Sequence, residues 1–125
     1  MKLTIIIFTI LNVLFFIVHE YDALKMGEWK MFTFLKGFSG KNQYLIFLYA
    51  HIPIFIFLIY YVISVLNLEN VFMYVIVNSF SILHLILHII ATKWKSNVFK
   101  KKHSFFIMYV FAATGFINLV LLIYY

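Results

Sequence analysis

Four long apolar stretches, separated by short polar or charged segments, constrain the fold of this chain more than any other feature. A helix that crosses the hydrocarbon core of a bilayer needs about 20 residues at about 1.5 Å per residue. Three stretches meet this length, and the first meets it when its helix continues through His19, Glu20 and Asp22 to about Leu24. We therefore predict an all-α membrane protein, a single domain formed by a four-transmembrane-helix bundle. The expected helices cover about residues 3–24, 43–67, 70–92 and 103–124 of the 125-residue chain.

The composition excludes other classes of protein. Hydrophobic residues make up 66% of the chain and charged residues 11%, against about 45–50% and about 25% in an average soluble domain. A soluble domain of this length buries only about two thirds of the surface of its unfolded chain, so it could not hide so much apolar area. The chain has no cysteine, which excludes disulfides and thiolate metal ligands. The lipid bilayer is the expected partner, and nucleic acid is not.

The lysines predict how the chain is oriented in the membrane. All ten basic residues are lysine, and nine of them lie in the first and third connections: Lys25, Lys30, Lys36, Lys41, Lys93, Lys95, Lys100, Lys101 and Lys102. The positive-inside rule places both connections in the cytoplasm and both termini outside. Abundant Phe, Ile, Tyr, Asn and Lys are typical of AT-rich bacterial genomes, so we expect a multi-pass protein of the bacterial inner (cytoplasmic) membrane.

Residues 23–38, in the first connection, alternate apolar and charged side chains. This pattern is typical of an amphipathic segment that lies in the membrane interface, and Trp29 is its expected anchor. Near the middle of the predicted helices, polar residues are expected to join helices by hydrogen bonds: Asn12, Asn78, Asn118, Ser79 and Ser81.

The predicted topology brings all five histidines into the cytoplasmic half of the bundle. His84 and His88 share one face of the third helix because they are four residues apart. His19 and Asp22, three residues apart, share a face of the first. His51 lies in the early turns of the second helix, and His103 is interpreted as an interfacial residue.

Imidazole and carboxylate groups at one depth are the usual ligands of zinc and of non-haem iron. The candidate metal ligands are His19, Asp22, His51, His84 and His88, with His51 either a fifth ligand or a hydrogen-bond partner of a ligand. Glu20 and Glu28 are the candidates for a catalytic base or for orienting a ligand histidine.

These residues also carry a family resemblance. The run His19-Glu20-Tyr21-Asp22-Ala23, followed by Glu28-Trp29, resembles the H-E-x-D-A…E-W motif of an uncharacterised family of small bacterial four-helix membrane proteins. The family's H-x-P motif is matched by residues 51–53 and its H-x-x-x-H motif by residues 84–88. Single matches follow at Phe99, Ser104 and Gly115. The resemblance implies that these polar residues belong together as a set, and it implies no activity.

Three functions are compatible with the pattern. The first is a metal-dependent membrane hydrolase or oxidase that acts on a lipid-like substrate at the cytoplasmic side. The second is a haem-binding or electron-transfer protein, with His51 opposite His84 or His88. The third is a non-enzymatic transporter or accessory subunit, in which a homo-oligomer would supply the polar residues that the outer half lacks.

Overall fold

The computed structural model describes residues 2–67 and 70–124, and its long elements are four helices. They are α1 (Lys2–Met26), α2 (Gly40–Asn67), α3 (Val71–Ala91) and α4 (Lys102–Ile123), and two short 3₁₀ turns, η1 (Glu28–Met31) and η2 (Thr33–Leu35), connect α1 to α2. Each long helix is long and apolar enough to cross a membrane. The all-α four-helix fold is therefore confirmed, and the helix ends lie within one turn of their predicted positions. Residues 1, 68–69 and 125 lie outside the described residues.

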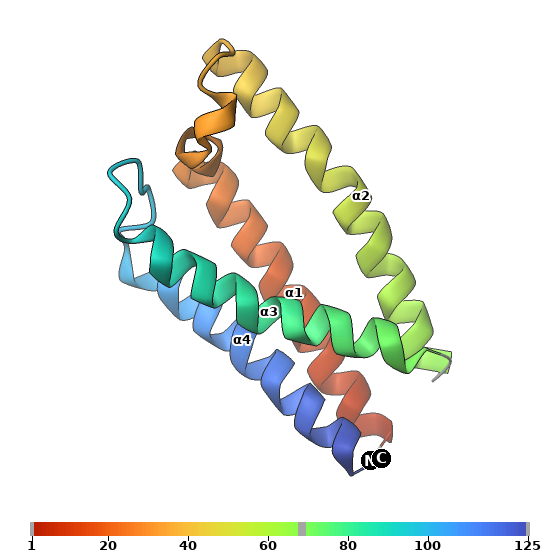
Figure 1. Ribbon diagram of the computed structural model, residues 1–125. Coiled ribbons are helices and arrows are strands. Elements are labelled where there is room, and N and C mark those ends of the chain that lie inside the picture. Colours follow the sequence, from red (N-terminus) through yellow and green to blue (C-terminus); the bar gives the residue numbers. More distant parts are fainter. Residues whose placement is uncertain (1, 68–69, 125) are drawn as a thin grey trace.

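Three of the helices pack closely, and the other stands partly apart. Most contacts between helices join α1 to α4 and α3 to α4, whereas α2 contacts α1 and α3 much less. Figure 1 shows α2 and α3 meeting near their short connection and diverging toward the opposite end. This divergence leaves space between α2 and α3 that side chains only partly fill.

Buried amides join the helices, as predicted for the asparagines. Asn12, Asn78 and Asn118 are all 0% exposed. The Asn12 side-chain amide donates from α1 to the Phe111 carbonyl of α4 at 3.0 Å, and that of Asn118 donates from α4 to the Asn78 oxygen of α3 at 2.9 Å. The two serines behave differently, because Ser81 donates within α3 to the Asn78 carbonyl and Ser79 faces outward. Hydrogen bonds of this kind contribute about 0.6 kcal/mol each in a membrane.

Gly115 allows α4 to lie close against α3. A Cβ atom at this position would meet the side chain of Ser81 and would lie 2.8 Å from the Asn78 carbonyl oxygen. Only a residue without a side chain fits between these backbones. The close approach places the last turns of α3, and therefore His84 and His88, at a fixed depth beside α4.

The connection from α1 to α2 contains the two short 3₁₀ turns η1 and η2. Gly27 ends α1 in the left-handed conformation, at φ 77°, and the chain turns back over the end of the bundle. Trp29, the expected interfacial anchor, packs edge-on against Tyr44 of α2 at 5.0 Å between ring centroids. The turn also brings Glu28 inward, where it is 8% exposed.

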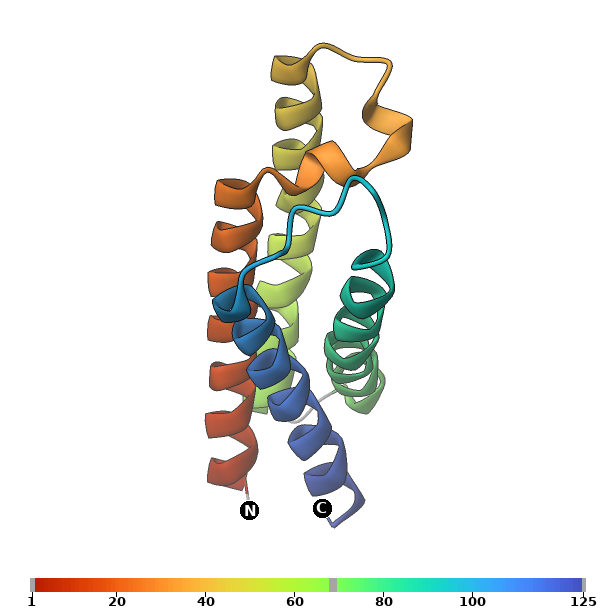
Figure 2. The same ribbon diagram turned by 90° about the vertical axis from the view of Figure 1, so that its left-hand side faces the viewer.

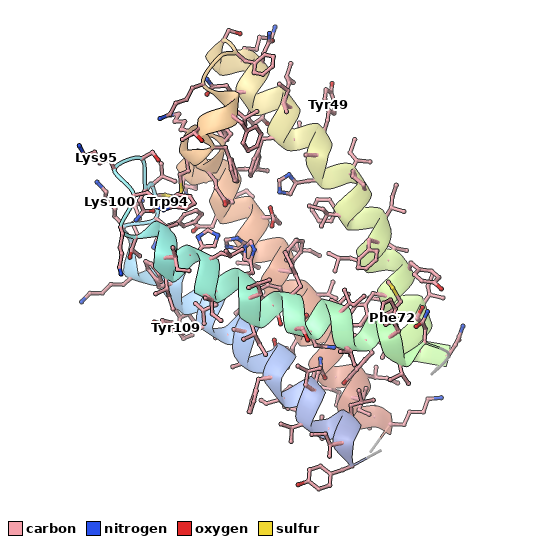
Figure 3. All side chains as sticks on the ribbon, in the orientation of Figure 1. Tyr49, Phe72, Trp94, Lys95, Lys100 and Tyr109 are labelled. Atoms are coloured by element: carbon pink, nitrogen blue, oxygen red, sulfur yellow. The ribbon has the colours of Figure 1, made fainter. Side chains whose placement is uncertain are left out.

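The two lysine-bearing connections lie at the same end of the bundle. Figure 2 shows the α1–α2 and α3–α4 connections side by side at the end opposite both termini, and the Ser96 hydroxyl joins them by donating to the Met31 carbonyl at 3.4 Å. Lys95 and Lys100 extend away from the helices there (Figure 3). The charge asymmetry of the sequence is therefore an asymmetry of the folded molecule.

Candidate metal centre

Three histidines from two helices meet near the lysine-bearing end of the bundle. His19 comes from α1, and His84 and His88 come from successive turns of α3. One nitrogen atom from each ring can be chosen so that all three lie within 4.8 Å of one another. The Nε2 atoms of His19 and His84 are 2.8 Å apart. The rings of His84 and His88 both stand edge-on to the ring of His19, with centroids 4.7 and 5.1 Å from its centroid. These three residues form a compact group, which we call the histidine cluster.

Local structure explains how the helices deliver these side chains. Helix α1 continues through His19-Glu20-Tyr21-Asp22 because no helix-breaking residue occurs before Gly27. Helix α3 begins at an Asn70 cap, whose side-chain oxygen accepts from the Met73 backbone N–H at 3.1 Å. The turn of α3 then places both of its histidines on the side that faces α1.

Phe99, from the α3–α4 connection, closes the cluster. Its side chain is 2% exposed. Its ring lies nearly parallel to that of His19 at 5.8 Å and edge-on to that of His88 at 4.5 Å. No physical argument from the residue pattern placed Phe99 at the site. In the sequence, Phe99 was singled out by the family resemblance alone. The same resemblance included Gly115 and Ser104, and Ser104 is completely buried.

Two nitrogen atoms of the cluster are buried without a partner. The Nδ1 atoms of His19 and His88 have no hydrogen-bond partner among the described residues, and the two side chains are 0% and 5% exposed. A buried polar atom is costly unless something satisfies it. Unpartnered imidazole nitrogens in a shielded position are suitable donors for a metal ion or an ordered water molecule.

Glu28 and Glu20 each face a different histidine. The Oε1 atom of Glu28 lies 3.5 Å from Nε2 of His88, so a carboxyl group stands behind a member of the cluster. Burial raises the pKa of the Glu28 carboxyl to about 8, with the nearby Glu20 adding to the rise and His51 opposing it. Burial therefore favours the protonated form of the Glu28 carboxyl group.

His51 lies outside the cluster, with both ring nitrogens engaged. Its Nε2 is 2.7 Å from Oε2 of Glu20, and its Nδ1 is 2.6 Å from the Phe47 carbonyl oxygen. The physical reason is the position of α2, which stands away from α1 and α3. The Glu20–His51 pair nevertheless lines the same pocket as His84 and Glu28, an open space of about 240 Å³ walled mainly by phenylalanine and aliphatic side chains.

Asp22 also points elsewhere, toward α4. Its Oδ1 atom lies 3.2 Å from Nε2 of His103. His103, interpreted from the sequence as an interfacial residue only, is exposed and is also the partner of Asp22. The structure brings together three of the predicted ligands, His19, His84 and His88, and it places Asp22 and His51 with other partners.

These features define a class of protein: a small helical protein with four membrane-length helices and a buried histidine cluster that could hold a metal ion. The model of the "Family of unknown function (DUF6713)" matches residues 5–125, and the chain belongs to this family. The expected membership of an uncharacterised family is therefore confirmed. No curated protein matches the chain, and no solved structure does.

Proposed function

We propose that this protein binds one divalent metal ion, zinc or iron, through His19, His84 and His88. The observation that carries the proposal is the convergence of three shielded imidazoles whose ligand atoms lie within 4.8 Å of one another. Zinc–nitrogen bonds of about 2.0–2.1 Å in a tetrahedral site place ligand atoms about 3.3 Å apart. Small ring movements are enough to reach that geometry. The unpartnered Nδ1 atom of His88 supports the same proposal, because the other ring nitrogen of His88 faces Glu28.

In a four-coordinate metal site, three histidine ligands leave one coordination position open. Asp22 and His51 face His103 and Glu20, respectively, and are not part of the histidine cluster. We therefore assign them to the surroundings of the metal. Glu28 is placed to orient the ring of His88, as carboxyl groups often do behind metal-bound histidines.

The proposed activity is hydrolysis of a lipid-like substrate. A metal ion in such a site, when bound, polarises a substrate oxygen and makes water more acidic. The Glu20–His51 pair lines the same pocket as His84. This pair is placed to accept the proton of the attacking water molecule and to return it to the leaving group. One water molecule is consumed, and one ester-like bond is cleaved into an acid and an alcohol.

The site is proposed to work at the cytoplasmic side of a bacterial inner membrane. Support comes from the positive-inside rule and from the lysine-bearing connections (Figure 2), which follow α1 and α3 shortly after His19 and His88. A haem held by His51 opposite His84 or His88 is not favoured, because both nitrogens of His51 already have partners.

Metal analysis of the purified protein tests the proposal. We expect on the order of one equivalent of zinc or iron per chain after extraction in mild detergent. His84→Ala and the more conservative His84→Gln should both lose the metal, whereas His103→Ala, outside the cluster, should retain it. A wild-type protein that stays below about 0.2 equivalents after incubation with either metal would overturn the proposal.

A further inference from the structure

The space between α2 and α3 continues beyond the polar pocket as an apolar groove. This groove has a volume of about 350 Å³ and is lined only by apolar side chains. Ile54, Phe57 and Leu58 of α2 form one wall, and Ile76, Val77 and Phe80 of α3 form the other. Phe16, Ile54 and Phe80 also line the polar pocket that contains His84. Polar pocket and groove are therefore two parts of one continuous surface.

The size and chemistry of the groove fit one hydrocarbon chain. A methylene group is close in size to a water molecule, whose share of liquid volume is about 30 Å³, so the groove takes about a dozen methylene groups. Its walls include no charged side chain and no side-chain hydrogen-bond donor or acceptor. Nothing in it would compensate a buried polar head group, which would lose its hydration without gaining a partner.

The direction of the groove fits an amphiphile lying in a membrane. The polar pocket is near the lysine-bearing end, and the groove extends from it toward the other end of the bundle. Ile76 and Phe57, on opposite walls, are 37% and 39% exposed. They lie where α2 and α3 face the surrounding lipid, so a chain can enter sideways without leaving the bilayer.

We propose that the groove binds the single alkyl chain of an amphiphilic substrate whose oxygen-bearing head group reaches His84. This inference rests on the proposed function, because His84 is one of the proposed metal ligands and an oxygen atom is a suitable occupant of an open coordination position. A substrate with two chains would leave the second one outside the groove, so the groove should favour amphiphiles with one chain. The groove would then bind the alkyl chain, and the adjoining polar pocket would hold the head group that reacts.

Photolabelling tests the proposal on the full-length protein in lipid nanodiscs. The probe is hexadecanoic acid that carries a diazirine in the middle of its chain. We expect adducts on the groove residues of α2 and α3. A phosphatidylcholine with the same photoreactive group on one of its two acyl chains should instead label the outer, lipid-facing residues.

Matched variants show whether the groove itself is responsible. Ile54→Trp fills the junction between the polar pocket and the groove, and Ile76→Trp narrows the groove from its α3 wall. Each variant should therefore lose the groove adducts. Ile56→Trp is the control of equal size, because Ile56 is 63% exposed and points away from the groove side of α2. It should leave the labelling unchanged.

The metal content of the same samples separates the two proposals. Metal binding without groove adducts would overturn the chain-binding inference alone. Equal labelling of the groove by the two-chain probe would do the same, and so would unchanged labelling of Ile54→Trp and Ile76→Trp. Groove adducts in a protein that binds no metal would overturn the proposed function and retain the alkyl-chain site.

Discussion

The Nε2 atoms of His19 and His84 lie 2.8 Å apart although the two residues are 65 positions apart in the chain. In the absence of an ion, one ring donates its N–H to the other, so the two imidazoles adopt different tautomers. An ion bound between them would replace this hydrogen bond by two bonds to the metal. The contact therefore links metal binding to the position of α1 relative to α3.

Metal binding is expected to stabilise the folded protein through this link. An ion at about 100 times its dissociation constant adds about 2.7 kcal/mol to the free energy of unfolding. We expect zinc or iron to raise the thermal unfolding midpoint of the wild-type protein in detergent, and a chelator to reverse the increase. His88→Ala should not respond, since it lacks one of the three ligands. The same shift in wild type and His88→Ala would place the stabilising ion elsewhere.

The raised pKa of Glu28 predicts how the stability of the metal-free protein depends on pH. Burial raises this pKa from 4.5 to about 8, so between these values the folded state holds a proton that the unfolded chain releases. The contribution of Glu28 to the free energy of unfolding should then fall as pH rises from about 5 to about 8. Glu28→Gln should weaken this dependence, because an amide does not titrate.

Thermal unfolding of the chelated wild type and Glu28→Gln at several pH values measures the effect. Lys30→Gln is a control at a neighbouring exposed position. Parallel pH profiles of the wild type and Glu28→Gln would show that the Glu28 carboxyl does not set the slope.

Removal of the Phe99 ring should open the histidine cluster. Truncation of a buried phenylalanine to alanine typically costs about 3–5 kcal/mol, and here it would also expose His19 and His88 to water. We expect Phe99→Ala to lower the unfolding midpoint and to release metal faster to a competing chelator. Phe34→Ala, at a position that is 72% exposed, is the matched control. Unchanged metal release in Phe99→Ala would mean that the ring does not shield the cluster.

Gly115→Ala should push α4 away from α3. The added Cβ would lie 2.8 Å from the Asn78 carbonyl oxygen, and overpacking of this kind costs about 1–3 kcal/mol. We expect a lower unfolding midpoint and weaker metal binding, because the α3 histidines would shift with their helix. Gly37→Ala, where an added Cβ meets nothing within 4 Å, should have little effect. Equal stability of the two variants would exclude a tight contact at Gly115.

Local sequence was enough to predict the helices and their approximate ends, because an apolar run of membrane length needs no distant partner to be recognised. It was also enough to pair His84 with His88, since four residues make about one helical turn. Counting residues along the predicted helices also placed the expected metal ligands and catalytic residues at the same depth in the membrane. Depth along a helix follows from counting residues, whereas the direction of a side chain around the helix axis depends on its neighbours.

Tertiary structure decided which of these residues meet. His19 reaches the α3 pair, whereas Asp22, less than one turn further along α1, faces His103. His51 stays with Glu20 because α2 diverges from the other helices, and this divergence also creates the apolar groove. The sequence by itself determined four apolar helices and one polar end. The rotation and separation of those helices, set by long-range contacts such as those at Gly115 and Asn12, determined the histidine cluster and the surface beside it.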